Sequence, residues 1–202
     1  MALEIADIPL AVLSRALDQT GAVIARVRPE QATLPTPCRS WDVYALVNHV
    51  VDEVRQFAAV TGGGERNHLG VDVLGDDWAG AYRRAADSLR AAWQRPGAMD
   101  GTVRLPFGEV PAIWTIGQQI TELAIHAWDI AKATGQPTDL DQDVARAAQE
   151  WGEANLKPEF RGDEADGSHI GPEIASSPDA SLYDRLAAFG GRDPHLTLSN
   201  EN

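Results

Sequence analysis

The stretch PAIWTIGQQITELAIHAWDIAKATG, residues 111–135, decides the fold that we predict for this chain. Its apolar residues recur with the period of an α-helix. Pro111 suits the first turn of that helix and Gly135 its C-terminal stop, so we expect it to run to about Thr134. At about 100° per residue, the polar side chains fall within one arc of about 100°, and they are Thr115, Gln118, Gln119, Glu122, His126 and Asp129. A surface helix has the reverse proportion of polar and apolar faces. The narrow polar stripe therefore favours a helix that lines an internal cleft, and the alternative is a thin solvated strip.

Similar periodicity predicts helices elsewhere, over residues 7–27, 40–61, 76–95 and 141–156, with a short one over 182–189. Ser40 is the expected N-cap of the second helix, with Asp42 in its first turn. Alternating apolar residues over 101–110 predict a short hairpin. Beyond Lys157 the chain becomes rich in Gly, Pro, Asp and Ser. We therefore predict an all-α four-helix bundle over residues 1–156, and a C-terminal strap with a short helix over 157–202 that packs on the same domain.

Composition narrows the classes of function. The chain has 202 residues, of which 44% are apolar, and its 17 basic and 30 acidic residues give a net charge of −13. This balance argues against nucleic acid and anionic lipid as partners. The longest stretch without a charged residue is 12 residues, over 110–121, whereas a membrane span needs about 20. Cys38 is the single cysteine, so no internal disulfide can form and a cytoplasmic location is expected.

Glu122 and His126 are one helical turn apart, which places their Cβ atoms about 5–6 Å from each other. A carboxylate oxygen and an imidazole nitrogen can then reach one metal ion, although an ordinary surface pair has the same spacing. A third ligand must come from another helix, and His49 is the best candidate by context. Three protein ligands leave a fourth position open, as in catalytic zinc sites. The other candidates for the third ligand lie in loops: His68, His169 and His195.

Four stretches carry a resemblance to a known family: TPCRSWD (36–42), LVNHV (46–50), ELAIHAWDIAKATG (122–135) and DRLAAFGGRDP (184–194). The first three resemble the metal-binding domain of the mycothiol-dependent maleylpyruvate isomerase family, in the DinB/YfiT-like superfamily. The last is similar to the tail of an actinobacterial branch of that superfamily. The resemblance covers nearly the whole chain. In this sequence we find no counterpart of the isomerase's separate C-terminal domain, so the resemblance does not identify the substrate.

The resemblance implies a four-helix bundle of DinB/YfiT type that binds a divalent metal, most often zinc, near one end. The ligand positions match His49, Glu122 and His126. It also implies that the metal activates a thiol, with mycothiol or a similar low-molecular-weight thiol as co-substrate and a small electrophile as partner. The enzyme would then be an S-transferase or an isomerase. The alternatives are a non-catalytic metal- or small-ligand-binding module, such as a sensor or stress-response protein, and a metal-free bundle. A homodimer is an open expectation.

The helical wheels suggest further residues near the metal, and Cys38 needs a separate interpretation. Asp129, three residues after His126, can orient that histidine from the side away from the metal. The alternative is an acidic residue on the helix surface. Cys38 precedes a helix N-terminus, where a thiol can be acidified, but a small residue packed in a Pro-rich turn is the favoured interpretation. The remaining predicted pocket residues are Gln119, Gln118, Thr115 and Glu53.

Overall fold

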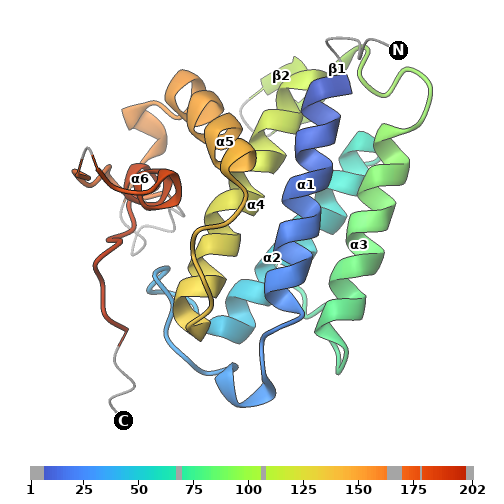
Figure 1. Cartoon of the computed structure of the whole chain (residues 1–202). Helices are drawn as coiled ribbons and strands as arrows, with labels where there is room; N and C mark the ends of the chain where they lie inside the picture. The colour runs from blue at the N-terminus through green and yellow to red at the C-terminus, as the bar shows by residue number, and fades with distance from the viewer. Residues whose placement is uncertain (1–6, 67–69, 106–107, 163–169, 178, 199–202) are drawn as a thin grey trace.

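The computed structural model describes residues 7–66, 70–105, 108–162, 170–177 and 179–198. Long helices α1 (Asp7–Ile24), α2 (Val43–Thr61), α3 (Trp78–Trp93) and α4 (Ala112–Thr134) form a bundle, as Figure 1 shows. In it, α1 packs on α3 and α4, and α2 packs on the same two helices. A fifth helix, α5 (Gln142–Asn155), covers α4 and α1, and a short one, α6 (Leu182–Phe189), packs on α5 and α4. The predicted all-α fold class is confirmed.

Local sequence explains where the helices begin and end. Gly135 adopts φ +70 and ends α4, because a left-handed backbone costs glycine no steric strain. Asp77 caps α3 by accepting a hydrogen bond from Gly80 N at 2.8 Å. The prediction of Ser40 as the cap of α2 was wrong: Asp42 caps this helix and accepts from Ala45 N at 2.8 Å. The first helix also ends at Ile24, three residues before the predicted limit.

A two-stranded antiparallel sheet precedes α4, as the alternation over 101–110 predicted. Strand β1 (Thr102–Leu105) pairs with β2 (Gly108–Pro111) in the register Val103 to Val110. Pro111 is the last residue of β2 and stands just before α4, so it lies outside the first turn where we expected it. The described residues also form two 3₁₀ turns, η1 (Pro29–Gln31) and η2 (Pro158–Phe160).

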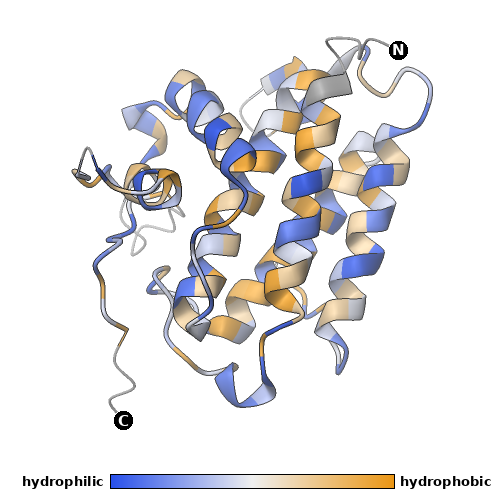
Figure 2. Ribbon diagram, viewed as in Figure 1, coloured by the Kyte–Doolittle hydropathy of each residue, from blue (hydrophilic) through white to orange (hydrophobic). Residues whose placement is uncertain are grey.

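The core lies between the helices of the bundle, and α4 supplies its centre. Apolar side chains with at most 2% of their surface exposed come from every long helix, and they include Leu17, Val47, Val51, Leu89, Ile116, Ala124 and Ile130. Figure 2 shows hydrophobic residues on the sides of the helices that face one another and hydrophilic residues on the outer turns of α3 and α5. Because α4 is covered by α1, α2 and α5, its polar side chains must find partners inside the protein.

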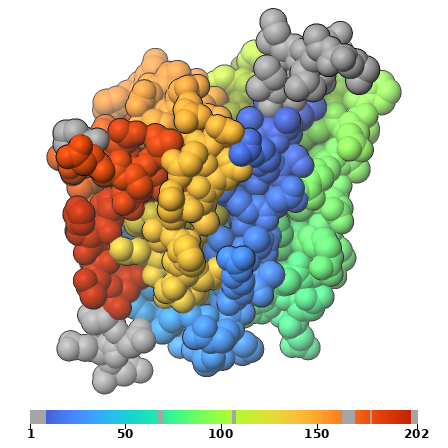
Figure 3. All heavy atoms as spheres, viewed as in Figure 1, coloured from blue at the N-terminus to red at the C-terminus, as the bar shows by residue number. Residues whose placement is uncertain are grey.

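The C-terminal segment lies along one side of the bundle, as the red spheres of Figure 3 show. Within this segment, backbone hydrogen bonds join residues 171–174 to the end of α6: Ile174 N donates to Ala188 O at 2.9 Å, and Gly171 N to Gly190 O at 3.3 Å. Arg161 adds a side-chain contact, since its guanidinium lies 4.3 Å over the Phe189 ring. Within the described residues, none of the helices combines the length and apolar character that crossing a membrane requires.

Candidate metal centre

His49, Glu122 and His126 lie together where α2 faces α4. One ligand atom from each side chain falls within 4.8 Å of the other two. The imidazole rings of His49 and His126 are 5.1 Å apart and nearly perpendicular, and His126 Nε2 is 3.4 Å from Glu122 Oε2. His126 is buried, whereas a third of the Glu122 side chain is exposed and His49 is half-buried. The predicted side chains therefore converge on one point that can be reached from solvent.

The donor set fits a divalent transition metal. Two imidazoles and one carboxylate with an open fourth position is a ligand set of catalytic zinc. Ligands at about 2.1 Å in a tetrahedron are about 3.4 Å from one another. The ligand atoms of His49, Glu122 and His126 all lie within 4.8 Å of one another, which is close to that spacing.

Opposite charges stabilise Glu122 and His126 beside each other. Burial by itself raises the pKa of Glu122, but the hydrogen bond to His126 and its charge outweigh burial and lower that pKa to about 2. Burial lowers the pKa of His126, yet its hydrogen bonds to Asp129, Cys38 and Glu122 raise it well above its usual value. These contacts therefore hold the proton of His126 more tightly than usual, and binding of a cation at Nε2 must displace a proton.

Trp41 forms an aromatic wall of the site. Its ring stacks on His49 with the centroids 4.3 Å apart and the planes tilted by 31°, and it lies 6.1 Å from the His126 ring. Trp41 directly precedes the cap residue of α2, so the turn that starts this helix also places the indole. The stacking restricts the orientation of the His49 imidazole.

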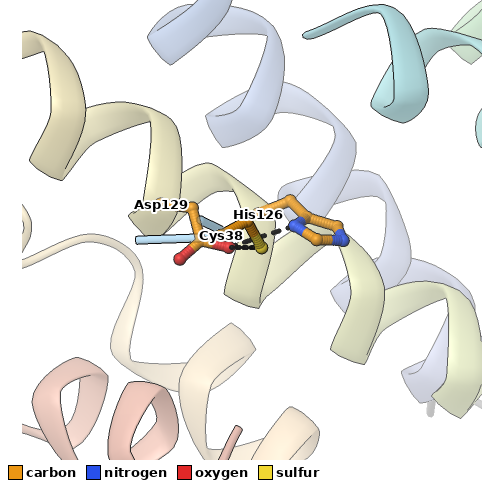
Figure 4. A group of neighbouring side chains, drawn as sticks. All are labelled: Cys38, His126 and Asp129. Carbon is orange, nitrogen blue, oxygen red and sulfur yellow. Dashed lines mark hydrogen bonds and ion pairs between the residues drawn. The ribbon is translucent and has the colours of Figure 1, made fainter. Parts of the chain in front are cut away.

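Behind His126, on the side away from Glu122, lies a second buried group. His126 Nδ1 is 3.1 Å from Asp129 Oδ2, and the Cys38 thiol donates to the same oxygen over 3.6 Å (Figure 4). Cys38, His126 and Asp129 thus also lie close enough to hold a cation. However, Arg192 Nη2 lies 2.8 Å from Cys38 Sγ and 3.2 Å from Asp129 Oδ2. The guanidinium already supplies the positive charge there, so this group is an ion-pair cluster.

Cys38 is packed, as the favoured interpretation of the sequence had it. Its exposed fraction is 3%. Burial and the negative charge of Asp129 raise the pKa of its thiol, in spite of His126 and Arg192 nearby. A thiol with a raised pKa is a poor nucleophile at neutral pH.

Four of the six polar residues of the α4 stripe are buried and the other two, Gln118 and Glu122, are half-buried, so the stripe is not a solvated strip. Thr115 and Gln119 are 4% and 1% exposed. Gln119 Oε1 accepts a hydrogen bond from Trp93 Nε1 at 2.9 Å, and Thr115 Oγ1 donates to Ala112 O at 2.7 Å. Together with Gln118 these residues line a small cavity beside Phe57 on α2. This cavity reaches the β-hairpin and lies on the hairpin side of the predicted metal ligands.

Glu53 lies one turn after His49 on α2 and forms an ion pair with Arg66. Arg66 Nη2 is 2.5 and 2.7 Å from the two carboxylate oxygens. Burial and then the charge of Glu122 raise the pKa of Glu53 to about 7, against the effect of Arg66. A second carboxylate thus borders the candidate centre without belonging to the ligand group.

Among the described residues, the remaining histidine does not join the group. His195 is exposed, and its backbone N donates to Asp193 Oδ1 at 2.9 Å. His68 and His169 lie outside the described residues. Sequence reasoning missed Arg192, which is 3% exposed and contacts Asp129 from a segment that has no periodic pattern.

Comparisons with known proteins agree with the motifs. The model of the mycothiol maleylpyruvate isomerase N-terminal domain matches residues 13–131. Two uncharacterized proteins from strains of Mycobacterium tuberculosis are each 36% identical over 187 residues, which covers 91% of this chain and 97% of theirs.

Among solved structures, the crystal structure of the mycothiol-dependent maleylpyruvate isomerase superposes with a TM-score of 0.62 at 15% identity, covering 91% of this chain and 88% of that chain. A variant of that enzyme superposes with a TM-score of 0.61. At this identity the structural match shows a shared fold. The family model and the mycobacterial relatives carry the assignment further: the chain belongs to the mycothiol maleylpyruvate isomerase N-terminal domain family.

Proposed function

We propose that the protein is a metal-dependent enzyme that uses a low-molecular-weight thiol of the mycothiol type, as a small-molecule S-transferase or isomerase. The observation that carries this proposal is the convergence of His49, Glu122 and His126 on one point at a partly open face. The family assignment and the likeness to a mycothiol-dependent isomerase supply the thiol. A cytoplasmic location, where such a thiol is available, is part of the same proposal.

The chain's own residues would hold the metal, for which zinc is the first candidate, and direct the approach of reactants. His126 is fixed from its buried side by Asp129, and Trp41 holds the His49 ring. Glu122 and His49 border the exposed side, so a thiol must enter from there. A zinc ion held by these residues would lower the pKa of an incoming thiol, so that it reacts as the thiolate.

Two reaction courses are open to such a thiolate. Attack on an electrophile that carries a leaving group forms a carbon–sulfur bond, expels that group with its electron pair and completes an S-transfer. Addition to a conjugated double bond allows rotation about the former double bond, after which the thiolate leaves and the isomer remains. Both courses use a small electrophile and need no further cofactor.

Metal content and turnover test the proposal together. We expect elemental analysis to find about one divalent ion per wild-type chain and almost none in His126→Ala, because removal of one of three ligands costs most of the affinity. Turnover of mycothiol with a set of electrophiles, maleylpyruvate among them, should be lost with a chelator and restored by zinc. Metal binding without turnover of any electrophile would instead support a non-catalytic binding module. A wild-type chain that binds no metal would refute both.

A further inference from the structure

On the side of His126 opposite the candidate metal lies the carboxylate of Asp129. Asp129 accepts from His126 Nδ1 at 3.1 Å and is completely buried. A histidine can bind a metal through Nε2 only if its ring is turned the right way and its remaining proton is on Nδ1. The Asp129 carboxylate favours both conditions, provided that it is itself held in place.

Arg192 holds that carboxylate. Its Nε lies 3.4 and 3.3 Å from the two Asp129 oxygens, and its Nη2 lies 3.2 Å from Oδ2. Nη2 also contacts Cys38 Sγ at 2.8 Å, and Nη1 donates to Gly190 O at 2.7 Å. Arg192 is 3% exposed, so its charge is removed from water, and the Asp129 carboxylate in contact with it offsets that charge. The planar guanidinium contacts several acceptors at once, which fixes the direction of the carboxylate.

The backbone around Arg192 explains how a C-terminal residue reaches this position. Gly190 follows α6, and Gly191 adopts φ +83, which turns the chain back toward the bundle. A Cβ at Gly191 would lie 2.6 Å from the backbone of Gly171, so the strap passes too closely for any side chain there. Arg192 N then donates to Ala187 O at 2.9 Å. The turn at Gly191, packed against Gly171, thus directs the Arg192 side chain inward.

We propose that Arg192 is a positioning residue of the metal centre: through Asp129 it orients His126 so that Nε2 faces Glu122 and His49. This inference rests on the proposed metal site and adds to it a dependence on the C-terminal strap. Cys38 closes the cluster, since its sulfur packs against the same guanidinium nitrogen.

Zinc affinity and the state of the His126 ring test the inference. Zinc affinity is measured by competition with a chromophoric chelator, and the protonated ring nitrogen of His126 is identified by nitrogen-15 NMR of the metal-free protein and the zinc complex. We expect Arg192→Ala to weaken zinc binding by about 10- to 100-fold, as loss of the group that orients a metal-binding histidine does. Arg192→Lys keeps the charge without the fork of donors, so it should restore part of the affinity.

Arg161 provides a matched control, because it also anchors the strap, through Gly171 O and Phe189 O, but does not touch Asp129. We expect Arg161→Ala and Arg161→Lys to keep zinc affinity within about threefold of the wild type, even if they lower stability. In an Asp129→Asn background, Arg192→Ala should cause little further loss, because both act through one residue. If Arg192→Ala fails to fold, the comparison of Arg192→Lys with Arg161→Lys decides.

The outcomes separate the two proposals. Wild-type zinc affinity and an unchanged His126 ring in both Arg192 variants would overturn the inference alone. Equal losses in the Arg161 variants would also overturn it, because the effect would then be a general loosening of the strap. A wild-type chain that does not bind zinc would overturn the proposed function and this inference together.

Discussion

Glu122→Gln separates the contribution of the carboxylate to stability from its contribution to metal binding. The substitution keeps the size of the side chain and removes the charge that faces His126 at 3.4 Å. A pKa lowered to about 2 corresponds to about 3 kcal/mol of stabilisation by the ionised form at neutral pH. Because a third of the side chain is exposed, solvent screening reduces this to about 1–2 kcal/mol. We expect the metal-free variant to lose that much unfolding free energy at pH 7.

The pH dependence of this loss has a definite sign. A carboxylate whose pKa is lowered in the folded state contributes stability that is present above its unfolded pKa. The contribution disappears as pH falls through the folded pKa. The stability difference between wild type and Glu122→Gln should therefore be full above about pH 4.5 and vanish toward pH 2. Urea denaturation followed by circular dichroism, at a series of pH values, measures it.

Zinc should widen the difference. A free zinc concentration of 100 times the dissociation constant stabilises the wild type by about 2.7 kcal/mol. Structural zinc binds with about 10–16 kcal/mol over four ligands, so one ligand is worth about 2.5–4 kcal/mol, or ~10²–10³ in affinity. The same zinc concentration would then stabilise Glu122→Gln by less than about 0.4 kcal/mol.

The control is Glu150→Gln, which makes the same change of net charge at an exposed position on α5. It should stay within about 0.5 kcal/mol of the wild type and keep the full gain from zinc. Equal stabilisation of Glu122→Gln and wild type by zinc would refute the ligand role of Glu122. No gain from zinc in the wild type would refute the site as a whole.

Three other outcomes follow from the same structure. Below the raised pKa of His126, zinc affinity should rise about tenfold per pH unit, because one proton leaves the imidazolium for each metal bound; competition titrations at several pH values measure this. Gly117→Ala should lower the unfolding free energy by about 1–3 kcal/mol, because the new Cβ would lie 2.0 Å from Trp151 Cδ1 and force that ring out of place; urea denaturation measures this. Gly135→Ala should cost about 1–2 kcal/mol and lower the melting temperature, because alanine is strained at φ +70; no atom of the described residues lies within 4 Å of the new Cβ, so the backbone strain is the whole effect. Thermal denaturation measures this, and an unchanged melting temperature would mean that α4 can end without a left-handed residue.

Helix positions could be predicted because their determinants are local. Gly135 ends α4 and Asp77 starts α3 through contacts within a few residues, and the sequence shows such residues directly. The start of α2 depends on a distant partner instead. Asp42 forms an isolated bridge with Pro35, and Val43 N donates to Leu34 O at 3.0 Å. This pairing keeps the chain extended past Ser40, so the equally suitable cap two residues later is used.

The candidate metal ligands were predictable to different degrees. Glu122 and His126 share one helix, so their spacing alone places them on one face. The prediction of His49 rested on its position on a rigid helix and on the resemblance to a family. Arg192 stands 63 residues from Asp129 and 154 from Cys38, in a segment without helical or strand periodicity. Periodicity therefore had no means of pairing it with either residue.

The polar stripe of α4 shows what a helical wheel leaves undetermined. The wheel correctly separates one face from the apolar remainder, but three different neighbours divide that face along its length. Near the hairpin, Gln119 meets Trp93, and this pair satisfies two buried polar groups within the core. One turn later Glu122 and His126 meet His49, and beyond them Asp129 meets Arg192. His126 lies at the boundary between the last two neighbours, with one ring nitrogen toward each. A substitution in the strap should therefore reach the metal centre through this single ring, whereas a substitution at the Gln119 end should alter stability and leave metal affinity unchanged.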